Sequence, residues 1–162
     1  MIVVSDTSPL NYLVLIQCAE LLPQIFGRVA APPAVITEML HPRAPMQVQK
    51  WAASPPSWLE VIAPKSVLSD LALGPGESAA IALAQELQAE VLLIDERKGA
   101  AVASLQGLAV AGTLTVLDLA AERRLLQLND AIDRLRHTTF RMPEVVVDEI
   151  LRRDARRKSG DS

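Results

Sequence analysis

The sequence has few cysteine, histidine and aromatic residues, and each shortage excludes a class of site. Its single cysteine, Cys18, excludes an internal disulfide framework and fits a reducing compartment. The two histidines, His41 and His137, are far apart and lack the spacing of metal ligands. Aromatic residues make up 3% of the chain, whereas hydrophobic residues make up 50%, so the core must be aliphatic.

Long apolar runs and a strong charge of one sign are also absent. No apolar stretch approaches the roughly 18 residues that span a bilayer, and no basic region precedes the first apolar run as in a signal peptide. We therefore expect one soluble, cytoplasmic domain with no membrane partner. The net charge of −3 argues against purely electrostatic nucleic-acid binding, although residues 121–162 carry 10 basic and 8 acidic side chains.

Short apolar strands are predicted to alternate with helices along the chain. We expect strands within 2–5, 28–33, 58–62, 90–95 and 108–112, and helices within 8–26 (one, or two broken near Pro23), 34–41, 46–53, 73–88, 96–107, 114–126, 129–137 and 143–158. The strands are continuous apolar runs, which is typical of a parallel sheet covered by helices on both faces. The fold class is therefore α/β.

Two of these buried strands end at an aspartate. Asp6 follows the first strand and Asp95 follows the strand that ends at Ile94. Ligands of open parallel sheets bind outside the carboxyl ends of the strands, so both are site candidates. Helix capping is the alternative for Asp6, but we expect Thr7 or Ser8 to cap the following helix, with Pro9 in its first turn.

Two glutamates lie on helix faces that are expected to pack inward. Glu38 shares a face with Ala34 and Val35, and Glu77 lies in the first turn of its helix. Four carboxylates in one small domain would raise each other's pKa unless a cation lay between them. Oxygen ligands alone favour Mg²⁺ or Mn²⁺, and such a site supports attack of metal-bound water on a phosphodiester.

Five segments in order resemble the PIN-domain family, in particular its short prokaryotic members related to VapC-type toxins. These segments are VVSDTSPL (3–10), PPAVITEM (32–39), GPGESAAIALA (74–84), LLIDERKGAAVA (92–103) and VAGTLTVL (110–117). The resemblance extends to about Leu151, which would leave residues 152–162 as a basic C-terminal tail. It implies a Rossmann-like three-layer α/β/α fold with a five-stranded parallel sheet.

The resemblance also implies a function and a set of site residues. The implied activity is metal-dependent cleavage of single-stranded RNA, as the toxin of a toxin–antitoxin pair that forms a homodimer and binds a small antitoxin. The family's acidic residues correspond to Asp6, Glu38, Glu77 and Asp95, which would act as catalytic residues and as ligands of Mg²⁺ or Mn²⁺. Where some relatives have a further acid, this sequence has Gly112 and Thr113, and Thr113 offers only a hydroxyl.

Further polar residues near these acids are candidates for substrate binding. They are Thr7, Ser8, Arg97, Lys98 and Thr113. Arg97 and Lys98 would contact phosphate at the rim of the acidic site, although first-turn residues facing solvent would look the same in sequence.

Two other functions remain open at this stage. The first is a nucleic-acid-binding or regulatory module that keeps the PIN fold with little or no catalysis. The second is a phosphotransfer or phosphatase protein, but its usual second aspartate is absent from the stretch Asp6-Thr7-Ser8. An intact set of four acids favours the nuclease.

Overall fold

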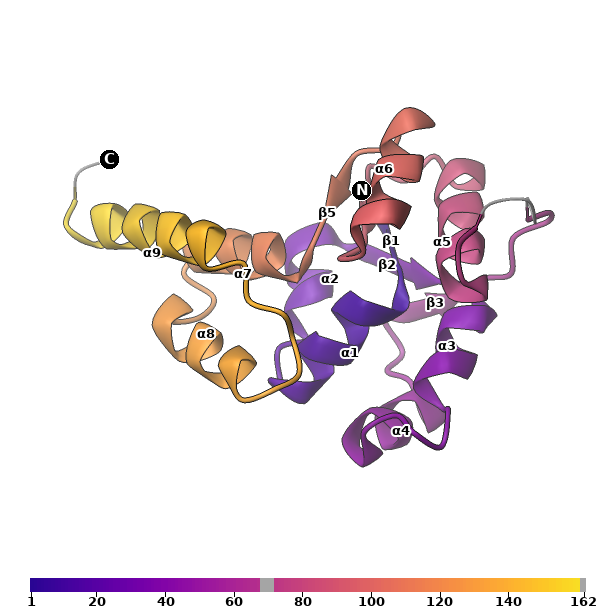
Figure 1. The fold of residues 1–162 in the computed structure, drawn as a ribbon, viewed down its shortest axis with the longest axis horizontal. Coiled ribbons are helices and arrows are strands. Elements are labelled where there is room, and N and C mark those ends of the chain that lie inside the picture. The colour runs from indigo at the N-terminus through magenta and orange to yellow at the C-terminus, as the bar shows by residue number, and fades with distance from the viewer. Residues whose placement is uncertain (68–71, 161–162) are drawn as a thin grey trace. The chain divides into compact units, whose positions relative to one another are not determined.

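The computed structural model describes residues 1–67 and 72–160 (Figure 1). Its strands are β1 (Ile2–Ser5), β2 (Arg28–Ala31), β3 (Leu59–Val61), β4 (Val91–Leu93) and β5 (Val110–Ala111). They form one sheet in the order β3-β2-β1-β4-β5, and every neighbouring pair is parallel. The predicted five-stranded parallel sheet is therefore confirmed.

The helices lie between and after these strands. They are α1 (Thr7–Leu15), α2 (Leu21–Phe26), α3 (Pro33–Met39), α4 (Met46–Ala53), α5 (Pro75–Glu86), α6 (Arg97–Leu105), α7 (Thr113–Glu122), α8 (Leu128–Arg136) and α9 (Glu144–Lys158). The chain divides into two compact units, residues 1–113 with the whole sheet and residues from 114 onward. None of the helices in the described part of the chain has the length and apolar character that crossing a membrane requires.

The predicted single helix or Pro23-broken pair over 8–26 needs a correction. The break falls before Pro23, because Gln17 has a left-handed backbone (φ 60°) and the amide of Cys18 donates to the carbonyl of Leu13. That bond closes the C-terminus of α1. Pro23 lies in the first turn of α2, where a missing N–H costs little.

Helices cover both faces of the sheet in the first unit. Figure 1 shows α2 and α5 on opposite sides of the strands, as right-handed crossovers require when the strand order reverses. The core is aliphatic, as the composition predicts. One cluster joins residues of the central strands to the inner face of α5, and includes Val4, Ala80, Ile81 and Leu92. The three-layer α/β/α prediction is confirmed.

The strand order places a topological switch point between β1 and β4. The chain leaves β1 toward β2 and leaves β4 toward β5, so the two connections diverge. Ser5 is in register with Leu93, and the amide of Asp6 donates to the carbonyl of Leu93 at 2.9 Å. The segments that follow β1 and β4 therefore start side by side, in the position where such sheets bind ligands.

Candidate functional site

Asp6 is buried directly after β1. Asp6 is 4% exposed, it occupies the N-cap position of α1, and its side chain makes no capping hydrogen bond. Its Oδ1 atom has no hydrogen-bond partner. The expectation that Thr7 or Ser8 caps this helix is wrong, because both lie within its first turn and their hydroxyls point elsewhere. A buried carboxylate that does not cap a helix needs another explanation.

The surroundings of Asp6 favour its protonated form. The pKa of Asp6 is raised to about 7: burial is the main cause, the backbone amide of Thr7 opposes the rise, and the negative charges of Glu77, Glu38 and Asp95 add to it. The three other predicted acids are therefore close enough to act on Asp6 electrostatically. This is the mutual repulsion that the sequence predicts for a group of carboxylates without a cation.

Asp95 follows β4 and is held by three donors. The Ser8 hydroxyl donates to Oδ2 at 2.7 Å. The Thr113 hydroxyl donates to the same atom at 2.7 Å, and the Thr113 amide donates to Oδ1 at 2.7 Å. Thr113 is fully buried. Asp95 thus connects the beginning of α1 to the beginning of α7.

Glu38 projects from α3 toward the same edge of the sheet. Its Oε2 atom accepts a hydrogen bond from the Thr7 hydroxyl, and its Oε1 atom accepts one from the amide of Gly76 at 3.1 Å. An inward-facing glutamate needs polar partners, and its own helix, with the sequence PAVITEM, contains no cationic residue. Those partners come instead from α1 and α5.

Glu77 lies in the first turn of α5 and has a buried, unpaired oxygen. Its Oε2 atom has no hydrogen-bond partner. Burial raises the pKa of Glu77, and the charges of Glu96 and Glu38 add to the rise, whereas the backbone amide of Gly74 and, more weakly, the charge of Lys98 oppose it. Asp6 and Glu77 thus each present one buried oxygen without a donor, which is an arrangement that a cation would satisfy.

Three glycines lie directly against site carboxylates, and the sequence reasoning missed them. A Cβ atom at Gly76 would collide with the carboxylate of Glu38, one at Gly99 with that of Glu77, and one at Gly112 with that of Asp95. In the sequence, Gly76 falls near the beginning of a predicted helix (73–88) and Gly112 at the end of a predicted strand (108–112). Their contacts with carboxylates depend on side-chain positions, which a sequence pattern does not give.

The contacts therefore bring Asp6, Glu38, Glu77 and Asp95 to one edge of the sheet. As the side chains stand, no three Asp, Glu, His or Cys residues within 1–67 and 72–160 are grouped so as to hold a metal ion. The donor set nevertheless consists of carboxylate oxygens, two of them buried without partners, and this chemistry fits a hard cation such as Mg²⁺ or Mn²⁺.

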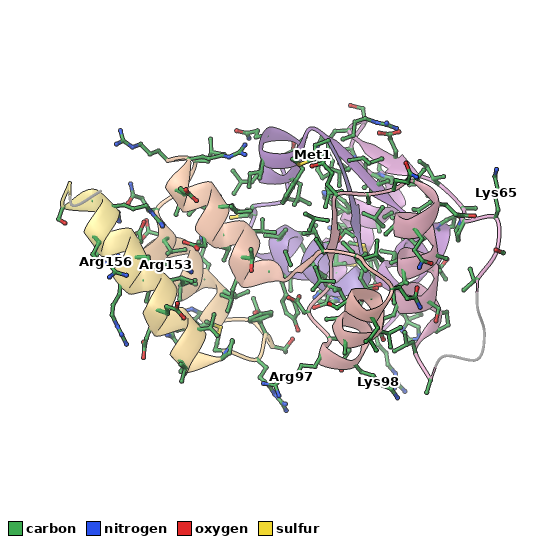
Figure 2. All side chains as sticks on the ribbon, turned by 90° about the horizontal axis from the view of Figure 1, so that it is seen from above. Met1, Lys65, Arg97, Lys98, Arg153 and Arg156 are labelled. Atoms are coloured by element: carbon green, nitrogen blue, oxygen red, sulfur yellow. The ribbon has the colours of Figure 1, made fainter. Side chains whose placement is uncertain are left out.

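Arg97 and Lys98 begin α6, directly after the β4 connection that carries Asp95. Both side chains are exposed, and Figure 2 shows them extending away from the ribbon. The positive charge of Lys98 lowers the pKa of Glu77, so Lys98 lies near the acidic edge. The three candidate hydroxyls are instead bound to the acids. Thr7 donates to Glu38, and Ser8 and Thr113 donate to Asp95.

The chain is similar to known proteins in structure and in sequence. A PilT N-terminus domain protein from the hyperthermophilic archaeon Sulfolobus solfataricus P2 has a similar solved structure, with a TM-score of 0.49 and 14% sequence identity over 88% of this chain and 100% of the other. No curated protein matches the chain significantly. A family model described as PIN domain (DUF3368) matches residues 2–156, which is nearly the whole chain. The chain therefore belongs to this PIN-domain family.

Proposed function

We propose that this protein is a metal-dependent endoribonuclease that cleaves single-stranded RNA, and that it is the toxin of a toxin–antitoxin pair. The PIN domain is generally a nuclease fold. The observation that carries the proposal is a pair of carboxylate oxygens, Asp6 Oδ1 and Glu77 Oε2, that are buried without partners. Asp6 lies at the switch point, and the negative charges of Glu77, Glu38 and Asp95 act on it there. Such oxygens are costly in a folded protein unless something binds them.

In this proposal Asp6, Glu38, Glu77 and Asp95 hold Mg²⁺ or Mn²⁺. The ion would supply an activated water and positive charge beside the scissile phosphate. The chain's own residues orient the ligands: Thr7 fixes Glu38, and Ser8 and Thr113 fix Asp95. These hydrogen bonds support a positioning role for the three hydroxyls, whose contact with RNA phosphate stays a prediction.

Arg97 and Lys98 are proposed to bind the RNA backbone beside the acidic edge. Their exposed side chains lie at the start of α6, and Lys98 acts electrostatically on Glu77. Cations at this place would draw a phosphate toward carboxylates that otherwise repel it. A small antitoxin is expected to cover the same edge and to offer a basic residue to the acids. The chain has a single cysteine, Cys18, which is buried, and this low cysteine usage agrees with the proposed cytoplasmic location.

The decisive experiment is cleavage of a single-stranded RNA by the purified protein with Mg²⁺ or Mn²⁺, with and without a chelator. We expect metal-dependent cleavage, a strong preference over double-stranded RNA, and a loss of orders of magnitude in rate for Asp6→Asn. Asn keeps the size of Asp6 and caps helices about as well, so a capping role would leave the rate unchanged. Equal rates for the wild type and Asp6→Asn would remove Asp6 from the mechanism.

A second candidate function is a binding module of PIN fold without catalysis. The observation in its favour is that no three potential ligands among the described residues are grouped for a metal ion. This module would bind single-stranded RNA whether or not metal is present and would not cleave it. RNA binding measured by fluorescence anisotropy beside the cleavage assay separates the two functions.

A further inference from the structure

We propose that Gly76 and Gly112 are positioning residues, because the missing side chain at each leaves the space that the carboxylates of Glu38 and Asp95 occupy. This inference rests on the proposed role of those carboxylates as metal ligands. Neither the backbone conformation of these two residues nor their position in the chain requires glycine, and the proposal gives a reason for it.

Gly76 lies in the first turn of α5, where any residue can adopt the backbone. Its φ is outside the left-handed region, and alanine is the better helix former. A Cβ atom here would lie 2.7 Å from both Oε1 and Cδ of Glu38, well inside the closest approach of real Cβ atoms. The same residue donates its amide to Glu38 Oε1. The backbone of α5 thus cradles this carboxylate at a point where a methyl group would displace it.

Gly112 plays the equivalent part for Asp95. It connects β5 to α7, and a Cβ atom on it would lie 2.7 Å from Asp95 Oδ1. That oxygen accepts the hydrogen bond from the Thr113 amide. A methyl group at residue 112 would therefore compete for space with the carboxylate at the atom through which it is anchored.

The colliding atoms are the ends of flexible side chains, which makes the expected effect specific. A carboxylate can rotate away from a new methyl group without moving the backbone, so the fold persists while the ligand leaves its place. Ligand geometry must be accurate to a fraction of an ångström for a metal site to keep its affinity. Substitution is thus expected to weaken metal binding without weakening the fold.

The chain offers a matched control in Gly74, two residues before Gly76. A Cβ atom on Gly74 would lie 3.6 Å from Glu77 Oε1, which is an ordinary van der Waals distance. Gly99 is unsuitable for the test, because a Cβ atom there would also lie 2.7 Å from Ile94 Cδ1 and would disturb the core. Gly74→Ala therefore controls for the loss of a glycine in the same segment.

The experiment compares Gly76→Ala, Gly112→Ala and Gly74→Ala in the full chain. Three quantities are measured: the thermal midpoint without metal, the affinity for Mn²⁺ by titration calorimetry, and the rate of RNA cleavage. For Gly76→Ala we expect a midpoint equal to or above that of the wild type, because alanine favours the helix, together with at least about tenfold weaker Mn²⁺ binding and a lower kcat. Gly74→Ala is expected to keep its Mn²⁺ affinity within about twofold.

Wild-type Mn²⁺ affinity in both Gly76→Ala and Gly112→Ala would overturn the inference, and so would an equal loss in Gly74→Ala. If the wild type binds no Mn²⁺ and cuts no RNA, the proposed function fails, and crystal structures of the metal-free variants decide the inference alone. In them the Glu38 carboxylate must leave the amide of residue 76, and the Asp95 carboxylate must leave the Thr113 amide. Carboxylates that keep their wild-type positions would refute it.

Discussion

Asp6 is the residue whose chemistry depends most on its surroundings. It ends a central strand, it is buried, and three other acids act on it. Burial raises the free energy of the ionised carboxylate, because the protein supplies few hydrogen-bond donors to replace water. The protonation of this one side chain should therefore connect pH, stability and metal binding.

The stability of the metal-free protein is expected to fall as pH rises. The pKa of Asp6 is about 7 in the folded protein and 3.8 as its ordinary value, so between these pH values the folded state binds the extra proton. The slope of unfolding free energy against pH is then negative, and the difference between pH 4 and pH 8 is on the order of a few kcal/mol. Urea unfolding at several pH values without metal measures it.

Asp6→Asn should remove most of that slope and make the metal-free protein more stable than the wild type at pH 8. The matched control is Glu90→Gln, which alters an exposed glutamate in the same unit and should keep the wild-type slope. An unchanged slope in Asp6→Asn would show that burial of Asp6 does not govern the pH dependence.

The affinity for a divalent cation is expected to change in the opposite direction. A cation competes with the proton on Asp6, so the apparent affinity for Mn²⁺ should rise about tenfold between pH 6 and pH 8, with protons released on binding. Calorimetry in two buffers of different ionisation enthalpy gives both quantities. An affinity that is flat over this range would contradict a site that includes Asp6.

Residue patterns indicate the four candidate acids but not the groups that donate hydrogen bonds to them. Asp6 and Asp95 were found because each follows an apolar strand, and Glu38 because it lies on a packed helix face. The donors that fix them could not be found in this way. Whether the Thr7 hydroxyl caps its own helix or donates to Glu38 depends on how α1 and α3 approach each other, which no local pattern encodes.

At the scale of elements, α7 and α9 are joined by ion pairs. Arg153 and Arg157 of α9 donate to Asp118 of α7 at 3.0 and 3.1 Å, and Arg157 also contacts Asp154. The side chain of Asp118 is 17% exposed, so water screens these contacts only in part. They are expected to stabilise the second unit more than an open surface pair would.

Asp118→Asn is predicted to destabilise the second unit by about 1–2 kcal/mol, because it removes the charge that two arginines share. The control is Glu144→Gln, which removes the charge of an exposed pair with Arg136. That change should have little effect on unfolding, since exposed pairs contribute little. Equal destabilisation by the two variants would mean that partial burial adds nothing to the Asp118 contacts.

The elements themselves could largely be predicted from sequence, because apolar runs and helical periodicity are local signals. The residues at which the elements begin and end were harder to predict from sequence. The break after α1 depends on the left-handed backbone of Gln17, a residue that carries no turn signature. The two-residue strand β5 is shorter than its apolar segment, since only Val110 and Ala111 are assigned to a strand beside β4.

At the scale of the whole molecule, we predict a homodimer to which α9 contributes. The first turn of this helix exposes Val145 (82%) and Val146 (43%), which is unusual for a helix that already buries Val147 and Ile150. Light scattering at micromolar concentration should show a dimer, and Val145→Glu should shift it toward monomer. Leu105→Glu is the control, because it places the same charge on an exposed apolar residue of α6.

A monomer at all concentrations would contradict this assembly. Dissociation by Leu105→Glu but not by Val145→Glu would show that the interface involves α6 and not α9.

The division into two compact units after Thr113 was not among the sequence expectations. Periodicity identifies each C-terminal helix, but it does not tell which helices pack together.

The order in which the site residues occur along the chain has a consequence for synthesis. Asp6 is made well before its partner strand β4 and before the anchor of Asp95 at Thr113, which are separated from it by most of the first unit. A ribosome must therefore add more than a hundred residues after Asp6 before the four acids can assemble. In the proposed function, the growing chain cannot cut its own messenger RNA until Thr113 has left the exit tunnel.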